Sequence, residues 1–274
     1  MRLAPLLALL ASLQAVAAEL PRVVSTNVCA DQLALRLAAP GQLLSVSALS
    51  RDPSLSGMAA LAQQVPINHA GAEEIIALNP DLVLASRRWL AHNRAELLRE
   101  HGIEVLVLPF PNNWDEIYAS TRLAAERLGR AEEGEALVAE TQARLARLQQ
   151  RPRPLRALYL RPNGGTAGSG TYVDTVFQAV GIENHQALRG RSGWGRFDLE
   201  ELVSDPPQLF VAAAMPGDGS YARAAYSRHP RVQQLLASRP FLQLHGSGWG
   251  CSDWQLASSA ERLAAAVDAL AVQP

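Results

Sequence analysis

The chain contains an internal repeat, and this feature restricts its fold more than any other. The first copy has Glu73-Glu74-Ile75-Ile76, then Pro80, then the apolar segment 82–85; the second has Glu200-Glu201-Leu202-Val203, then Pro207, then the apolar segment 209–212. Corresponding positions are 127 residues apart throughout. Each copy predicts a short helix, a proline-containing turn and a buried parallel strand. One such unit could match by chance in any α/β protein, but the flanking strands at 22–25 and 156–160 and the helices at 31–38 and 173–180 correspond as well. We therefore predict two α/β lobes of similar topology.

Residues 114–150 lie between the two halves and carry only helical patterns. Asp115 can cap a helix that runs to Leu128, where Gly129 interrupts it. Apolar residues then recur at helical spacing from 131 to 150, and a proline-rich segment ends the pattern. This arrangement predicts an N-terminal lobe at 19–128, one long linking helix at 129–152 and a C-terminal lobe at 153–274, with a ligand cleft between the lobes.

The first 18 residues predict a cleaved secretory signal peptide, with a buried N-terminal helix as the alternative. They combine Met1-Arg2, an apolar run shorter than a membrane span and small residues before Glu19. No cysteine stands at the cleavage point, so we expect a periplasmic protein that is not a lipoprotein. In that oxidising compartment Cys29 and Cys251 could form a disulfide, and two separate buried thiols are the alternative.

The composition argues against several functional classes. The chain has 25 basic and 26 acidic residues, so its net charge of −1 gives no global attraction to nucleic acid or to an anionic membrane. All the basic residues are arginine, which excludes a P-loop lysine and a Schiff-base lysine. The sequence also lacks a Gly-x-Ser-x-Gly elbow, a His-Glu-x-x-His motif and an evident carboxylate pair joined to a histidine. We therefore expect no catalytic residues.

Several segments resemble the class III periplasmic binding proteins, which serve ABC importers for vitamin B12, iron–siderophores and haem. The similar runs are 22–25 with 31–34, 45–47 with 52–53, 71–83, 98–107, 197–202 and 207–209. The resemblance implies a monomeric, non-catalytic receptor that traps a small-molecule metal chelate between its lobes. It also implies delivery to an ABC permease dimer in the inner membrane. One docking glutamate per lobe is implied, Glu73 and Glu200, with Glu74 and Glu201 as the neighbouring alternates.

Ligand sites in open α/β sheets form at the loops that follow the strands. The candidate cleft residues on these loops are Asn27, Leu49, Arg51, Ser86, Trp89, Asn163, Gly165, Trp194 and Trp249. Trp194 is singled out because Ser192-Gly193-Trp194-Gly195 is too polar and glycine-rich for a core segment, whereas core packing is the alternative for each other tryptophan. Leu49 and Ser86 stand where the vitamin B12-binding relative has aromatic residues. The glycine-rich run 163–170 lacks the Gly-Lys-Ser/Thr of a phosphate loop; it either lets backbone approach a bulky ligand or is a plain flexible loop.

The charged and metal-ligating residues leave the ligand open. Loop arginines at 51, 87, 88, 161 and 191 would suit an anionic chelate, although solvated surface arginines are the common alternative. His69 and His245 could ligate a haem iron or a bare ion, but no histidine pair has metal-ligand spacing, so we predict no metal site and no resident cofactor. The expected ligand is an iron–siderophore or a cobalamin-type corrinoid, with haem ranked below them. An exported α/β enzyme and a direct metal-ion receptor are the alternative functions.

Overall fold

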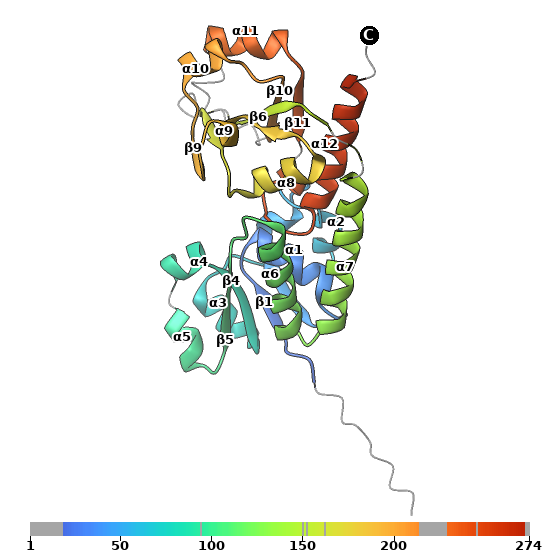
Figure 1. Ribbon diagram of the computed structural model, residues 1–274. Helices are drawn as coiled ribbons and strands as arrows, with labels where there is room; N and C mark the ends of the chain where they lie inside the picture. Colours follow the sequence, from blue (N-terminus) through green and yellow to red (C-terminus); the bar gives the residue numbers. More distant parts are fainter. Residues whose placement is uncertain are drawn as a thin grey trace, which may run out of the picture.

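A computed structural model describes residues 19–93, 95–149, 151, 153–161, 163–213, 229–244 and 246–271. The predicted signal peptide and His245 lie outside these residues. The described chain folds into two α/β lobes, which lie one above the other in Figure 1. Within these ranges, no helix combines the length and apolar character that crossing a membrane would require.

The N-terminal lobe is built on a five-stranded parallel sheet with the order β3-β2-β1-β4-β5. Its strands are β1 (Val23–Ser25), β2 (Leu43–Ser47), β3 (Ile67–Asn68), β4 (Leu82–Ser86) and β5 (Glu104–Leu108). Its helices are α1 (Val28–Leu37), the 3-10 helix η1 (Ala48–Arg51), α2 (Ala59–Ala62), α3 (Ala72–Leu78), α4 (Arg87–His92) and α5 (Ala95–Glu100). Successive strand residues point to opposite faces, so Val23 packs in one core cluster with α1 and Val24 packs in another with α3 and α5.

The C-terminal lobe repeats this topology around a four-stranded parallel sheet of order β11-β10-β6-β8. Its strands are β6 (Arg156–Leu160), β8 (Glu183–Asn184), β10 (Leu209–Ala213) and β11 (Phe241–Leu244), with an antiparallel pair of β7 (Gly165–Ala167) and β9 (Trp194–Arg196) beside them. Its helices are α8 (Tyr172–Val180), α9 (His185–Leu188), α10 (Leu199–Ser204), α11 (Pro230–Ser238), the 3-10 helix η2 (Gly246–Gly248) and α12 (Leu256–Ala271). The predicted repeat corresponds to α3–β4 and α10–β10, and the prediction of two similar α/β lobes is confirmed.

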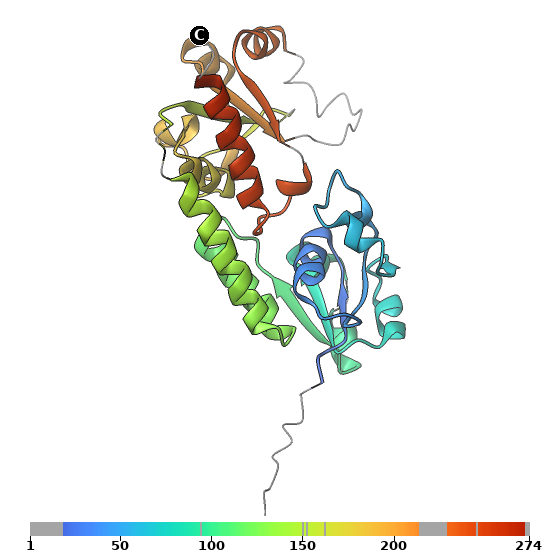
Figure 2. The same ribbon diagram turned by 90° about the vertical axis from the view of Figure 1, so that its right-hand side faces the viewer.

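Two helices connect the lobes, α6 (Trp114–Arg127) and α7 (Ala131–Leu148), whereas the sequence pattern predicts one linking helix at 129–152. The difference arises because α6 also packs in clusters of both lobes. Asn113, and not the predicted Asp115, caps α6: its side-chain oxygen accepts a hydrogen bond from the backbone N–H of Glu116 at 2.9 Å. Gly129 makes the turn between the helices at a φ of +69°. The long helix α7 lies along both lobes in Figure 2 and contributes to both cores, because Leu137 packs in an N-lobe cluster and Leu145 in the main C-lobe cluster.

Candidate ligand-binding cleft

Four rings from separate parts of the C-terminal lobe form a continuous cluster, which we call the aromatic wall. It consists of Tyr159 on β6, Tyr172 at the start of α8, Trp194 on β9 and Trp249 after η2. The Tyr172 ring lies 5.2 Å from that of Trp194 and 5.8 Å from that of Trp249, measured between centroids. Trp249 is the buried side of the wall, with 1% of its surface exposed, whereas Trp194 is 39% exposed. The wall therefore offers the Trp194 indole as an open flat surface on a rigid backing.

Arg161 places a cation on the aromatic wall. Its guanidinium carbon lies 4.3 Å from the centroid of the Trp194 ring and 5.7 Å from that of Tyr159, both within cation–π range. Gly165 makes room for this side chain, because a Cβ there would come within 3.2 Å of the Arg161 Cδ. Burial raises the pKa of Tyr172 above its ordinary value, so its phenol stays protonated. The wall can therefore stack on a flat group and pair with an anion.

The facing surface of the N-terminal lobe holds a cavity of about 230 Å³, which we call the N-lobe cavity. It is lined by the loops after β1, β4 and β5 and by two residues near α12; the lining includes Asn27, Ser86, Arg87, Arg88, Phe110, Ser252 and Asp253. Phe110 joins the two surfaces, because it lines the cavity and its ring lies 5.9 Å from that of Tyr172. In Figure 1, α8 occupies the side of the C-terminal lobe that faces the N-terminal lobe. The cavity and the aromatic wall thus form one cleft between the lobes.

The structure brings several of the predicted cleft residues to these surfaces. Asn27 and Ser86 line the N-lobe cavity, where they cap α1 and α4 by accepting from the backbone N–H groups of Ala30 and Trp89. Gly165 lies against Arg161, and Asn163 accepts from the Gly165 N–H at 2.9 Å. Leu49 lies on η1 with 57% of its surface exposed, and the structure places it in neither the N-lobe cavity nor the aromatic wall as described.

Two predicted cleft residues serve the N-terminal lobe itself instead. Trp89 is only 6% exposed and packs in the core, and its indole N–H donates to the carbonyl of Ala70 at 2.9 Å. Because α4 begins directly after β4, its first turn folds Trp89 back onto the sheet. Arg51 donates to the carbonyls of Ala62 and Val65 at 3.2 and 2.6 Å, which ties η1 to the end of α2.

Sequence reasoning missed Tyr159, Tyr172 and Phe110, and it identified Arg161 only as one of several loop arginines. Tyr159 lies within an apolar strand and Tyr172 opens an amphipathic helix, so the pattern of each segment marks both as core. The one available signal was their position, at the carboxyl end of β6 and directly after the glycine-rich run 163–170. The described residues contain no group of three or more His, Cys, Asp or Glu side chains placed to hold a metal ion.

Two buried carboxyl groups lie close to the cleft. Asp31 of α1 is fully buried and accepts hydrogen bonds from the backbone N–H and the hydroxyl of Ser47, and burial raises its pKa to about 6. Asp253 is 4% exposed and accepts from the Gln32 amide and from the Gln255 N–H, both at 2.9 Å. Burial raises the pKa of Asp253 to about 7, because a charge is costly away from water. Both carboxyl groups therefore bind their protons more tightly in the folded protein than in the unfolded chain.

We expect the stabilising contribution of protonated Asp253 to fall as the pH rises from about 5 to 8. Asp253 binds its proton more tightly when folded than when unfolded, so its contribution is present at low pH and is lost as the pH rises through about 7. Asp253→Asn keeps an oxygen for the Gln32 amide and removes the titration. Denaturant melts at pH 5 and 8 would measure the free energy of unfolding of the wild-type protein and of the variant. The decrease between the two pH values should be smaller in the variant by on the order of 2 kcal/mol. Asp31 titrates in both proteins and so serves as an internal control; an equal loss in both would contradict the assignment.

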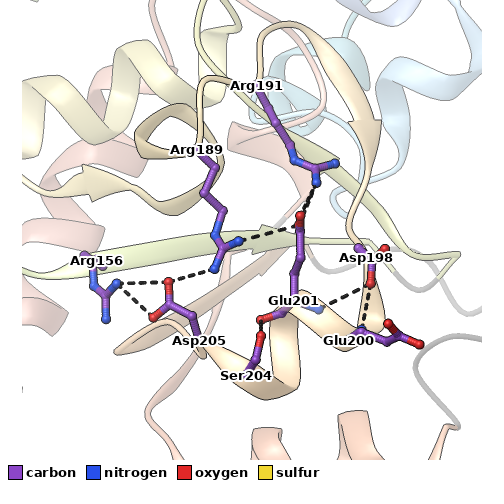
Figure 3. Close-up of polar contacts among 8 residues, drawn as sticks. All are labelled: Arg156, Arg189, Arg191, Asp198, Glu200, Glu201, Ser204 and Asp205. Carbon is purple, nitrogen blue, oxygen red and sulfur yellow. Dashed lines mark hydrogen bonds and ion pairs between the residues drawn. The ribbon is translucent and has the colours of Figure 1, made fainter.

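The two glutamates expected to dock the permease occupy equivalent positions on the lobes, and their neighbours are held in place. In Figure 3 the Glu201 carboxylate accepts from Arg191 at 2.6 Å and faces Arg189 at 3.8 Å, while the Glu200 side chain points away from these arginines. In the other lobe, Glu74 accepts from the His69 N–H at 2.8 Å. Glu73 and Glu200 are both exposed. Each lobe therefore presents the first glutamate of its pair outward.

The second glutamate of the C-terminal lobe belongs to a wider ion-pair network. The Asp205 carboxylate forms ion pairs with the guanidinium groups of Arg189 at 2.8 Å and Arg156 at 3.1 Å (Figure 3). These pairs link the end of α10 to β6 and to the loop after α9. Asp198 caps the helix by accepting from the Glu200 and Glu201 N–H groups. These contacts fix the orientation of α10 and hence the direction in which Glu200 projects.

Comparison with known proteins gives the same fold and a family. The chain is 23% identical over 171 residues to an uncharacterized ABC transporter substrate-binding lipoprotein, YvrC, of Bacillus subtilis; the match covers 58% of this chain and about half, 52%, of that relative. The periplasmic haem-binding protein HutB of Vibrio cholerae superposes with a TM-score of 0.70 at 21% identity, covering 89% of this chain and 97% of that one. The vitamin B12-binding protein BtuF of the same organism superposes with a TM-score of 0.63 at 19% identity, covering 92% and 99%. The family model described as periplasmic binding protein matches residues 23–243, and the chain therefore belongs to the periplasmic binding protein family.

Proposed function

We propose that this protein is the receptor of an ABC importer and that it captures a metal chelate between its two lobes. The observation that carries the proposal is the aromatic wall with Arg161 stacked on Trp194. A flat apolar surface with a cation on it suits a macrocyclic or aromatic chelate that also bears acidic groups. The names of the solved relatives, which bind haem and vitamin B12, support the same class of ligand. In this proposal the protein works without a resident cofactor or a catalytic step.

The N-lobe cavity complements the wall. Arg87 and Arg88 line it and both are exposed, so they add positive charge at its opening, while its deeper lining includes Leu33, Ala85 and Leu108. An acidic group of the ligand would meet the arginines, and an apolar edge would enter the cavity. The charge of these residues favours an anionic ferric-siderophore or a carboxylated macrocycle over an uncharged ligand.

A fluorescence titration tests the proposal. Haemin, cyanocobalamin, ferric enterobactin and ferrichrome would each be added to the purified protein, because a bound chelate quenches a nearby indole. We expect saturable quenching at one ligand per protein with at least one of these probes. Absence of saturable binding to all four by a folded protein would contradict capture of a metal chelate.

The ligand should contact Trp194 directly. Trp194→Ala is expected to weaken binding of the chelate that saturates in the titration by about 1–3 kcal/mol, roughly a 5- to 150-fold rise in Kd. The thermal midpoint should barely move, because the ring is 39% exposed. Trp89→Phe is the matched control: this indole lies in the N-lobe core, so its loss should lower stability and leave the Kd unchanged. A large loss of stability in Trp194→Ala with an unchanged Kd would show that Trp194 has a structural role.

In its proposed role the protein is exported to the periplasm and delivers its ligand to a permease. The predicted signal peptide at 1–18 without a cysteine at its end supports export to the periplasm as a protein without a lipid anchor, although the B. subtilis relative is a lipoprotein. Glu73 and Glu200 would each contact one subunit of a permease dimer, since the two lobes present them at equivalent positions. A monomeric receptor could then dock symmetrically. Exposed ion pairs of this kind add specificity and association rate more than affinity.

A further inference from the structure

A short segment of the C-terminal lobe passes into the core of the N-terminal lobe and returns. Trp249 is buried in the main C-lobe cluster, whereas Trp254, only five residues later, packs with Leu33 and Leu37 of α1 in an N-lobe cluster. At Leu256 the chain is again in the C-lobe cluster, where α12 begins. In Figure 2 the beginning of α12, in red, reaches toward the blue N-terminal lobe. We call residues 249–255 the interlobe strut.

A disulfide closes the interlobe strut onto the N-terminal lobe. Cys251 is bonded to Cys29 in the first turn of α1, with the two Cα atoms 5.3 Å apart and a sequence separation of 222. A hydrogen-bonded clasp lies beside it: Gln32 donates to Asp253 at 2.9 Å and accepts from the Gly57 N–H at 2.8 Å. Gln32 is 1% exposed, so this clasp is shielded from water. The lobes are thus joined on two sides, by α6 and α7 and by the strut.

The interlobe strut also touches both surfaces of the cleft. At one end Trp249 backs the aromatic wall, with its ring 5.7 Å from that of Tyr159. Farther along the strut, Ser252 and Asp253 line the N-lobe cavity together with Cys29 of α1. A lobe that is connected to the other lobe at one place can rotate relative to it. A second connection restricts that rotation. The strut therefore sets the spacing between the aromatic wall and the N-lobe cavity.

The disulfide can be reached from the cleft. Cys29 is half-buried and lines the N-lobe cavity, whereas Cys251 is only 4% exposed. A small dithiol entering the empty cleft would attack the Cys29 sulfur, and the Cys251 thiolate would leave and take up a proton from water. The second thiol of the dithiol would then attack the mixed disulfide and release Cys29 as a thiol. Two electrons pass to the cystine, and the dithiol becomes a cyclic disulfide.

We infer that the interlobe strut is a redox-cleavable brace: its disulfide holds the two cleft surfaces at a fixed spacing, and a ligand in the cleft shields that disulfide from thiols. The first half depends only on the fold, and the second half rests on the proposed function. By linkage, a ligand that prefers the braced cleft must bind the reduced protein more weakly. The oxidation state of one bond would therefore control how firmly a chelate is held.

The brace is tested without any ligand by measuring distances between the lobes. Spin labels would be attached through ketone-bearing amino acids at Leu90 on α4 and Leu188 on α9, which are 37% and 57% exposed, so no new cysteine is needed. Pulsed electron resonance should give a narrow distance distribution in the oxidised protein and a clearly broader one in Cys29→Ser with Cys251→Ser. A label pair within the N-terminal lobe, at Leu61 and Leu90, is the control and should not change. An unchanged interlobe distribution would overturn the brace. Broadening of the control pair would also overturn it, since the disulfide would then be holding one lobe's own fold.

The shielding is tested by the rate of disulfide reduction. The protein would be treated with dithiothreitol alone or with saturating haemin, cyanocobalamin, ferric enterobactin or ferrichrome, and maleimide labelling would count the released thiols. We expect the probe that saturates in the titration to slow reduction at least fivefold, and the reduced protein to bind that probe at least fivefold more weakly. Equal rates with and without a bound probe would overturn the shielding. If no probe binds, the proposed function fails, while the distance measurement still decides the brace.

Discussion

Replacing both cysteines by alanine should lower the free energy of unfolding by about 2–5 kcal/mol. The Cys29–Cys251 bond closes a loop of 222 residues, and cross-linking positions so far apart removes much of the conformational freedom of the unfolded chain. The loss should appear in urea melts of the double variant and, to the same extent, in melts of the wild-type protein after reduction. Because single-domain proteins are stable by only about 5–15 kcal/mol, a change of this size is easily measured.

A neighbouring residue provides the matched control for the cysteine variants. Ser252 follows Cys251 in the interlobe strut and is 7% exposed, and its hydroxyl has no hydrogen-bond partner among the described residues. Ser252→Ala removes one oxygen at the same place and should change the stability by less than about 1 kcal/mol. If both variants lost the same stability, the effect would come from disturbing the strut rather than from losing the disulfide. Unchanged stability after reduction would contradict the expected contribution of the bond.

Reversing the charges of the two outward glutamates should abolish uptake and leave ligand binding intact. In Glu73→Arg with Glu200→Arg, each lobe would present a cation where the proposed docking contact on the permease accepts an anion. Like charges at a docking contact cost far more than a lost exposed ion pair. Both residues lie on exposed first turns of α3 and α10, away from the N-lobe cavity, so the chelate Kd should not change. Uptake of the labelled chelate by cells that produce the variant as their only receptor measures the effect.

Two further double variants separate docking from helix-end electrostatics. Glu96 and Glu132 are exposed first-turn residues of α5 and α7, so Glu96→Arg with Glu132→Arg makes the same change of charge at helix starts elsewhere, and transport should remain normal. Glu74→Gln with Glu201→Gln removes the carboxylates held by His69 and Arg191 and should reduce uptake only in part, by loosening α3 and α10. Normal transport by Glu73→Arg with Glu200→Arg would remove the docking role.

Two lobes, the repeated helix–strand units and the helical character of the segment between the lobes could be predicted because each rests on local patterns. An apolar run bounded by turn residues indicates a strand that is buried on both faces of a sheet. Apolar residues at helical spacing indicate a helix with one buried face. Neither pattern depends on which element packs against that face. The equivalent positions of the paired glutamates could be predicted for a similar reason. Their offset along the chain is enough to place them at equivalent points of two similar lobes.

Which aromatic residues meet a ligand depends on contacts that no local pattern reports. Trp89 and Trp194 both follow polar segments in the sequence. Trp89 nevertheless packs in the core through the first turn of α4, whereas Trp194 stays 39% exposed on β9. Tyr159 and Tyr172 read as core residues from their segments, and only the meeting of β6, α8 and β9 assembles them with Trp194.

The sequence by itself determined the two-lobe α/β architecture, the helical character of residues 114–150 and the positions of the paired glutamates. Only the tertiary structure decided the aromatic wall, the place of Arg161 and the path of the interlobe strut that brings Cys251 to Cys29. The physical reason is that periodic burial is set by neighbours a few residues away, whereas these sites arise where side chains up to 222 residues apart converge through packing.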